Sequence, residues 1–174
     1  IKNQGYFCVD TETTSLNELE ANLVGIALSV EPGKSCYIPL GHKKNSTSEE
    51  TLFDENPTND PSQLTQTEVL RVLKPLLETD TILKIGQNIK YDLIVLKNNG
   101  IEISPVEDTM LLSYVLDAGN NRHNMDTLSE LHLGHKTISY KDVVGTGKKQ
   151  LNFSEVNLEE ATKYAAEDSD ITLR

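Results

Sequence analysis

The stretch YFCVDTET, Tyr6–Thr13, places two carboxylates at the end of a hydrophobic run. Aromatic and β-branched side chains favour strands, so residues 5–11 are expected to form one. Side chains two residues apart on a strand point to the same face, which would bring Asp10 and Glu12 together. Two like charges held side by side and removed from water are unfavourable unless something compensates them. A bound cation is the simplest compensation.

The length and composition indicate a globular domain. A chain of 174 residues is long enough for one domain with a sizeable core, so residues 1–174 are expected to form a single domain. No stretch is long and apolar enough to cross a membrane. The N-terminal residues run into a strand rather than a signal peptide. The chain starts without Met and ends within a helical pattern, so we expect a fragment of a longer protein.

The two cysteines, Cys8 and Cys36, both fall in strand-like runs. Free cysteines behave as small hydrophobic residues, and disulfides are rare where thiols stay reduced. Both are therefore expected to pack in the core of a cytoplasmic protein.

The net charge of −11 argues against a general nucleic-acid coat, because such binding depends on Lys and Arg neutralising phosphates. The charge is uneven, however. Residues 122–149 carry a net charge of +2, and the rest of the chain carries −13. A local basic patch beside an acidic pocket and an ordinary solvated surface are both compatible with this segment.

The order of the expected elements predicts the fold class. Residues 22–30 and 35–40 predict two further strands, joined by a turn at Pro32-Gly33, so an antiparallel meander is expected. Residues 81–86 predict a fourth strand, and the polar residues 41–63 predict a long loop. Helices are expected to begin near Thr65, Thr127 and Asn157, each followed three residues later by Glu, and two others to end at Gly100 and Gly119. The sequence therefore predicts an α/β fold with a mixed central sheet flanked by helices.

Two further carboxylates occupy suggestive positions. Asp92, in GQNIKYD, begins a helix after the fourth strand, and Asp168, in YAAEDSD, lies on the last helix one turn after Tyr164. Each alone is an ordinary helix residue, favoured by the helix dipole or by a side-chain pair. Together with Asp10 and Glu12 they would offer four carboxylates at one place.

Oxygen ligands of this kind select hard cations such as Mg²⁺ or Mn²⁺. Two such cations suit phosphoryl chemistry, and the Tyr164 hydroxyl could orient an attacking water. The sequence has no Cys or His cluster of the zinc-finger kind, no G-x-S-x-G and no Gly-rich phosphate loop. The GTGK of residues 145–148 is too short for a nucleotide loop, and no strand precedes it.

Three motifs, DTET, NIKYD and YAAED, resemble those of DEDD-type 3′–5′ exonucleases, in the subgroup that has Tyr in the third motif. Longer stretches resemble the proofreading domain of bacterial DNA polymerase I, in order and at the family spacing over nearly the whole chain. They are GQNIKYD, NMDTLSELHLGHKTISYKDVVGTGKKQLNF and EEATKYAAEDSDITL. The family fold is ribonuclease H-like, which agrees with the expected order of strands and helices.

The resemblance implies a two-metal site of Mg or Mn, with Zn possible at one position. Asp10, Glu12 and Asp168 would hold the first ion, with Asp10 bridging to the second. Asp92 would support the second ion, largely through waters. Tyr164 would position the nucleophilic water.

The resemblance also implies residues that bind the substrate. Glu12 and the backbone of Thr13 would meet the terminal 3′-hydroxyl, and Leu16 would wedge against the last base. Tyr140 would stack on a base at a position where the family often has Phe. Gln87 and Asn88 would contact the nucleic-acid strand. From the sequence alone, Leu16 could instead be a buried loop anchor and Tyr140 a core aromatic residue.

The implied activity removes nucleoside 5′-monophosphates from single-stranded or frayed 3′ ends of DNA. The implied partners are single-stranded DNA and a polymerase domain in the same parent chain, with no membrane and a monomer by default. A ribonuclease D-type exoribonuclease, which would share the same carboxylates, remains an alternative. A structural domain that has lost catalysis is a second alternative, although such remnants lack the carboxylates that this chain has.

Overall fold

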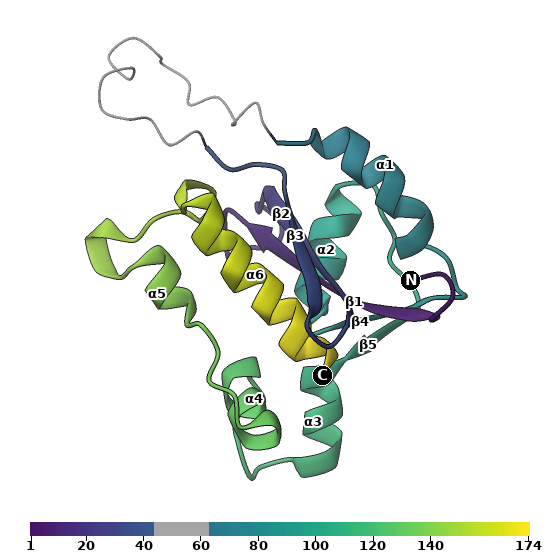
Figure 1. Ribbon diagram of the computed structural model, residues 1–174, viewed down its shortest axis with the longest axis vertical. Coiled ribbons are helices and arrows are strands. Elements are labelled where there is room, and N and C mark those ends of the chain that lie inside the picture. Colours follow the sequence, from purple (N-terminus) through teal and green to yellow (C-terminus); the bar gives the residue numbers. More distant parts are fainter. Residues whose placement is uncertain (44–62) are drawn as a thin grey trace.

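The computed structural model describes residues 1–43 and 63–174, which form one mixed sheet with helices on both faces (Figure 1). A loop was predicted for residues 41–63, and residues 44–62 of it lie outside the described residues. The strands are β1 (Tyr6–Thr13), β2 (Leu23–Glu31), β3 (Lys34–Pro39), β4 (Leu83–Gly86) and β5 (Val106–Asp108).

The sheet has the strand order β3-β2-β1-β4-β5. Strands β1, β2 and β3 form the predicted antiparallel meander, and Gly33 takes a positive φ of 76° in the turn between the last two. Strand β4 pairs with β1 in parallel, and β5 pairs with β4 in parallel. The mixed sheet is confirmed. The three-residue strand β5 was not predicted, because so short a run has no clear alternation of apolar and polar residues.

Helices and short 3₁₀ turns account for the remaining elements. They are α1 (Gln66–Leu77), α2 (Lys90–Asn98), α3 (Thr109–Asp117), α4 (Met125–Leu133), α5 (Tyr140–Val144), η1 (Gly147–Lys149), η2 (Phe153–Glu155) and α6 (Leu158–Leu173). Thr65 and Asn157 cap α1 and α6 as predicted, each accepting a bond from a backbone N–H of the first turn.

The predicted start of a helix at Thr127 is wrong. Helix α4 begins two residues earlier, because Asn124 takes the extended backbone of an N-cap residue. The Thr127 hydroxyl donates to Asn124 Oδ1 at 2.7 Å. Helix α5, which begins at Tyr140, was also not predicted.

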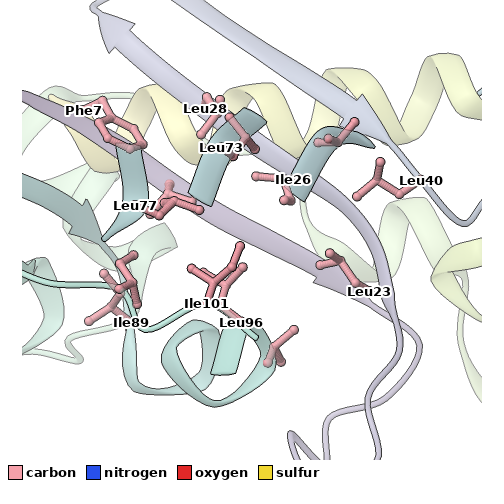
Figure 2. Packing of buried hydrophobic residues seen from close by; sticks show 14 of the residues in the cluster. Phe7, Leu23, Ile26, Leu28, Leu40, Leu73, Leu77, Ile89, Leu96 and Ile101 are labelled. Atoms are coloured by element: carbon pink, nitrogen blue, oxygen red, sulfur yellow. The ribbon is translucent and has the colours of Figure 1, made fainter. Parts of the chain in front are cut away.

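The two faces of the sheet bury separate clusters. Phe7 and Val9 point to the face covered by α1 and α2, where Leu73, Leu77 and Leu96 pack against them (Figure 2). On the other face α6 lies along the sheet (Figure 1). Its contact surface is made of small buried residues, Ala161, Ala165 and Ser169. Small side chains let a helix approach a sheet closely, which matters for the site below.

The prediction that both cysteines pack in the core is half correct. Cys8 is buried, whereas Cys36 is exposed. Strand β3 is an edge strand, and Tyr37 beside Cys36 occupies the position that faces the cluster under α6. No helix in the described part of the chain is long and apolar enough to cross a membrane.

Lys84 in β4 is fully buried, and its side chain hydrogen-bonds to backbone carbonyl groups that lie before and after the strand in the chain. Its Nζ donates to the carbonyl oxygens of Thr79 at 2.9 Å and Ile82 at 2.7 Å, and also to that of Ser104. Of these acceptors Ile82 is buried, so its carbonyl oxygen would lose this donor inside the protein if the ammonium were removed.

We predict that Lys84→Met lowers the free energy of unfolding by about 2–3 kcal/mol, because hydrogen bonds from a charged group are lost and the buried Ile82 carbonyl oxygen loses its ammonium donor. Urea denaturation followed by circular dichroism measures the change. The exposed Lys97, whose Nζ lies 3.8 Å from a carboxylate oxygen of Glu102, supplies the control Lys97→Met. Equal effects of the two variants would contradict a stabilising role for the hydrogen bonds of Lys84.

Candidate active site

Strand β1 presents Asp10 and Glu12 on the face covered by α6, and Asp168 of α6 meets them there. One carboxylate oxygen from each of the three residues lies within 4.8 Å of the others. Glu12 and Asp168 are buried, and Asp10 is half-buried. The predicted convergence of these three carboxylates is therefore present in the fold.

The close approach of α6 brings Asp168 to β1. Asp168 follows Ala165 by three residues, so it sits on the edge of the helix surface that contacts the sheet. Its Oδ1 atom is buried and has no hydrogen-bond partner among the described residues. A buried carboxylate oxygen without a partner is unfavourable in an empty site, and it is what a cation ligand requires.

Asp92 reaches the same cavity from α2, on the other face of the sheet. Its Oδ1 atom accepts hydrogen bonds from the backbone N–H of Thr11 at 2.9 Å and from the Thr11 hydroxyl at 2.5 Å. Thr11 stands between Asp10 and Glu12 on β1, so these bonds fix the first turn of α2 against the acidic end of the strand. Asp92 thus lies beside the three-carboxylate cluster but outside it.

A β-bulge occurs opposite the acidic end of β1. The pairing register shifts between Glu12 and Thr13, and Glu12 lies opposite Gly25 of β2. A Cβ on Gly25 would lie only 2.2 Å from the Tyr37 hydroxyl oxygen, so glycine leaves the space for this ring. The Tyr37 hydroxyl in turn lies 2.8 Å from Nε2 of the buried His42. The sheet beneath the carboxylates is therefore packed with side chains.

The carboxylates line an open cavity of about 510 Å³, which is within the range of small-molecule sites. All the predicted substrate residues border it: Thr13, Leu16, Gln87, Asn88 and Tyr140. Leu16 is 90% exposed, so the alternative of a buried loop anchor is wrong. Tyr140 is 37% exposed, and its ring stacks on that of the buried Phe153, with the ring centroids 6.3 Å apart and an angle of 8° between the ring planes.

Gln87 and Asn88 form the turn between β4 and α2. The Gln87 amide nitrogen donates to the carbonyl oxygen of His123 at 2.8 Å. Asn88 takes a positive φ of 57°, and its backbone N–H donates to Asp108 at 3.0 Å. The Ile89 N–H donates to the second oxygen of Asp108 at 3.1 Å. Asp108, which the sequence did not single out, therefore holds the turn that places both residues at the cavity.

Several residues that line the cavity were not singled out from the sequence, among them Tyr91, Asn152 and Phe153. The Tyr91 hydroxyl bonds to Thr13 Oγ1 and to the carbonyl oxygen of Ser15. Asn152 and Phe153 also border the cavity. The position of Tyr91 next to Asp92 within NIKYD was an available indication. Nothing local in the sequence marks Asn152, since its side chain bonds to Thr14, which lies 138 positions away in the chain.

Burial raises the pKa of each of the four carboxyl groups. It raises the pKa of Asp10 to about 6, and it raises that of Asp168 to about 8 with a further contribution from the charge of Asp10. The pKa values of Glu12 and Asp92 lie well above their ordinary range, mainly through burial and through the charges of neighbouring carboxylates. The fully ionised cluster therefore needs positive charge, and its all-oxygen donor set fits a divalent cation such as Mg²⁺ or Mn²⁺.

Comparison with known proteins agrees with this site. A family model of 3′–5′ exonucleases matches residues 1–174. The chain belongs to this 3′–5′ exonuclease family. A DNA polymerase I of Rhizobium leguminosarum is 45% identical over 179 residues, which cover 98% of this chain. A DNA polymerase I of Pseudomonas aeruginosa is 45% identical over 95% of this chain. In both cases the chain spans only 17% of the relative's length.

Solved structures share the fold of this exonuclease domain. Brucella melitensis NrnC has a TM-score of 0.67 at 22% identity, with 98% of this chain and 69% of that chain covered. Escherichia coli RNase D, an exoribonuclease, has a TM-score of 0.63 at 19% identity, with 99% and 38% covered. The predicted ribonuclease H-like fold is confirmed.

The raised pKa values predict how stability depends on pH in the presence of a chelator. Asp10 and Asp168, with ordinary values of 3.8, hold protons more tightly in the folded chain than in the unfolded chain. They therefore lower the free energy of unfolding as pH rises from about 4 to about 8. We expect Asp168→Asn to match the parent chain near pH 4 and to melt several degrees higher at pH 8.5.

Thermal denaturation in chelator at the two pH values measures this difference. The exposed Asp142 supplies the control, since Asp142→Asn removes one carboxylate that is not part of the cluster. The same pH dependence in the parent chain and in Asp168→Asn would show that Asp168 does not carry the unfavourable charge.

Proposed function

We propose that this domain is a metal-dependent 3′–5′ exodeoxyribonuclease that removes nucleoside 5′-monophosphates from single-stranded or frayed DNA ends. The observation that carries the proposal is the cluster of Asp10, Glu12 and Asp168 in a cavity bordered by the exposed Leu16 and by Tyr140. The cluster suits phosphodiester hydrolysis, and the apolar side chains suit a nucleobase.

Asp10, Glu12 and Asp168 would hold a first divalent cation, and Asp10 with Asp92 would support a second. Such cations lower the pKa of a water and stabilise the leaving oxygen of a phosphodiester. The orphaned Oδ1 of Asp168 supports this assignment from the chain's own geometry. Mg²⁺ and Mn²⁺ are the candidates, because no His or Cys joins the described ligands.

Tyr164 would position the attacking water. It lies on α6 one turn before Asp168, and burial together with the charge of Asp168 raises its pKa well above the ordinary value. The phenol therefore stays protonated at neutral pH and offers a hydroxyl that both donates and accepts. This role is one of orientation, since a phenol of raised pKa is a poor general base.

Leu16 and Tyr140 would hold the terminal base between apolar surfaces. Contacts of this kind are largely indifferent to base identity. Preference for a mismatched end would then arise because such an end leaves the duplex at a lower cost. Glu12 and the backbone of Thr13 would receive the terminal 3′-hydroxyl, and Gln87 and Asn88 would border the strand.

The relatives favour DNA over RNA as the substrate. The two polymerases are 45% identical to this chain, whereas the exoribonuclease RNase D shares the fold at 19% identity. We therefore infer that the domain proofreads for a polymerase domain of the same parent chain. An exoribonuclease and a domain without catalysis are the outcomes that would replace this proposal.

The first test is digestion of a 5′-labelled single-stranded DNA oligonucleotide with Mg²⁺, with Mn²⁺ and with chelator. We expect a metal-dependent ladder that shortens from the 3′ end. The double variant Asp10→Ala/Glu12→Ala should lose at least about 10³-fold in rate, since several kcal/mol of transition-state stabilisation depend on the cations. An RNA oligonucleotide of the same sequence should be cut more slowly.

The double variant Glu102→Ala/Glu107→Ala is the matched control, because it removes two exposed carboxylates and the same charge. Cleavage at the parent rate by Asp10→Ala/Glu12→Ala would refute the site. Faster cleavage of RNA than of DNA would favour the exoribonuclease. No cleavage with either metal would favour a structural domain.

A further inference from the structure

Residues 150–153 line part of the cavity, and the side chain of Asn152 joins them to another part of its lining. Asn152 Nδ2 donates to the carbonyl oxygen of Thr14 at 2.7 Å, although the two residues are 138 positions apart in sequence. Thr14 follows β1 directly and belongs to the turn that carries Leu16. The bond therefore joins the Leu16 turn to the wall formed by residues 150–153.

The oxygen and the nitrogen of the Asn152 side-chain amide make different hydrogen bonds. Its Oδ1 accepts hydrogen bonds from Ser154 N at 3.0 Å and Ser154 Oγ at 2.9 Å, which makes Asn152 the N-cap of η2. Its backbone N–H donates to Glu155 Oε2 at 3.0 Å and completes a capping box. Capping does not require the Nδ2 donor, so the bond to Thr14 is a separate contact that a substitution can remove.

Asn152 is also linked to Tyr140 through the residue that follows it in the chain. Phe153, the next residue, is buried and stacks on Tyr140, and its ring centroid lies 6.0 Å from that of Tyr164. The carbonyl oxygen of Ser154 accepts a bond from Lys43 N at 2.8 Å, which anchors this segment to the end of the meander. A displacement of Asn152 would thus move Phe153 and the Tyr140 ring that rests on it.

We infer that Asn152 is a positioning residue that fixes the separation of Leu16 and Tyr140 and thereby the fit of the terminal nucleotide between them. This inference rests on the proposed function for its substrate. The carboxylates do not depend on Asn152, because β1 and α6 hold them from within the fold. Loss of the Nδ2 contact should therefore weaken substrate binding and leave the chemical step nearly unchanged.

The test compares Asn152→Ser with Asn157→Ser. Serine caps helices about as well as asparagine, so both variants keep their caps, but serine at 152 lacks the Nδ2 amide group that donates to Thr14. Asn157 caps α6 through its Oδ1 and is the matched control. We expect Asn152→Ser to raise KM for single-stranded DNA about fivefold to tenfold, with kcat changed less than about twofold. The urea midpoints of the two variants should agree.

Binding of a 5′-labelled oligonucleotide in chelator, followed by fluorescence anisotropy, gives a readout that does not need cleavage. The Kd of Asn152→Ser should rise by a factor similar to that of KM. Equal KM and Kd in both serine variants would overturn the inference. A joint fall in kcat and in the urea midpoint of Asn152→Ser would also overturn it, in favour of a purely structural role. If the parent chain binds DNA without cutting it and Asn152→Ser weakens binding, the positioning role holds and the proposed function fails.

Discussion

Mutual repulsion among buried carboxylates is the constraint on which the architecture of this domain depends. Asp10, Glu12 and Asp168 bring an oxygen each within 4.8 Å of one another, and the side chains of Glu12 and Asp168 are buried. Such a cluster is unfavourable for an empty fold, and it is stable when positive charge or protons compensate it. The domain therefore stores an unfavourable local arrangement that a divalent cation relieves.

The rest of the fold keeps these carboxylates together despite their mutual repulsion. The meander sets the register of β1, so that Asp10 and Glu12 point to one face. The small residues of α6 permit the close approach that delivers Asp168. The two bonds from Thr11 to Asp92 tie the opposite layer to the same strand. Elements from both faces of the sheet thus meet at the C-terminal end of the central strand β1, and no single element carries the site.

The residues in the walls of the cavity are held in place differently from the carboxylates at its base. Leu16 is held out in solvent, whereas Tyr140 rests on Phe153, which also contacts Tyr164. Tyr91, through Thr13 and Ser15, and Asn152, through Thr14, hold the turn between β1 and β2 from two sides. Hydrogen bonds to backbone atoms therefore position the apolar surfaces. This arrangement suits a substrate recognised by shape and stacking rather than by base identity.

Periodicity and spacing in the sequence were enough to determine the meander, the main helices and the pairing of Asp10 with Glu12, because strand and helix geometry places residues i+2 and i+4 on one face. Carboxylate chemistry suggested that Asp92 and Asp168 join this pair beside Tyr164, and the motif resemblance then indicated the same site. Only the tertiary structure decided the short strand β5, the start of α4, the exposure of Cys36 and the carbonyl ties of Lys84. The same holds for the bond from Asn152 to Thr14. Contacts between residues distant in the chain leave no local pattern, so they emerge only when the sheet and α6 have been assembled.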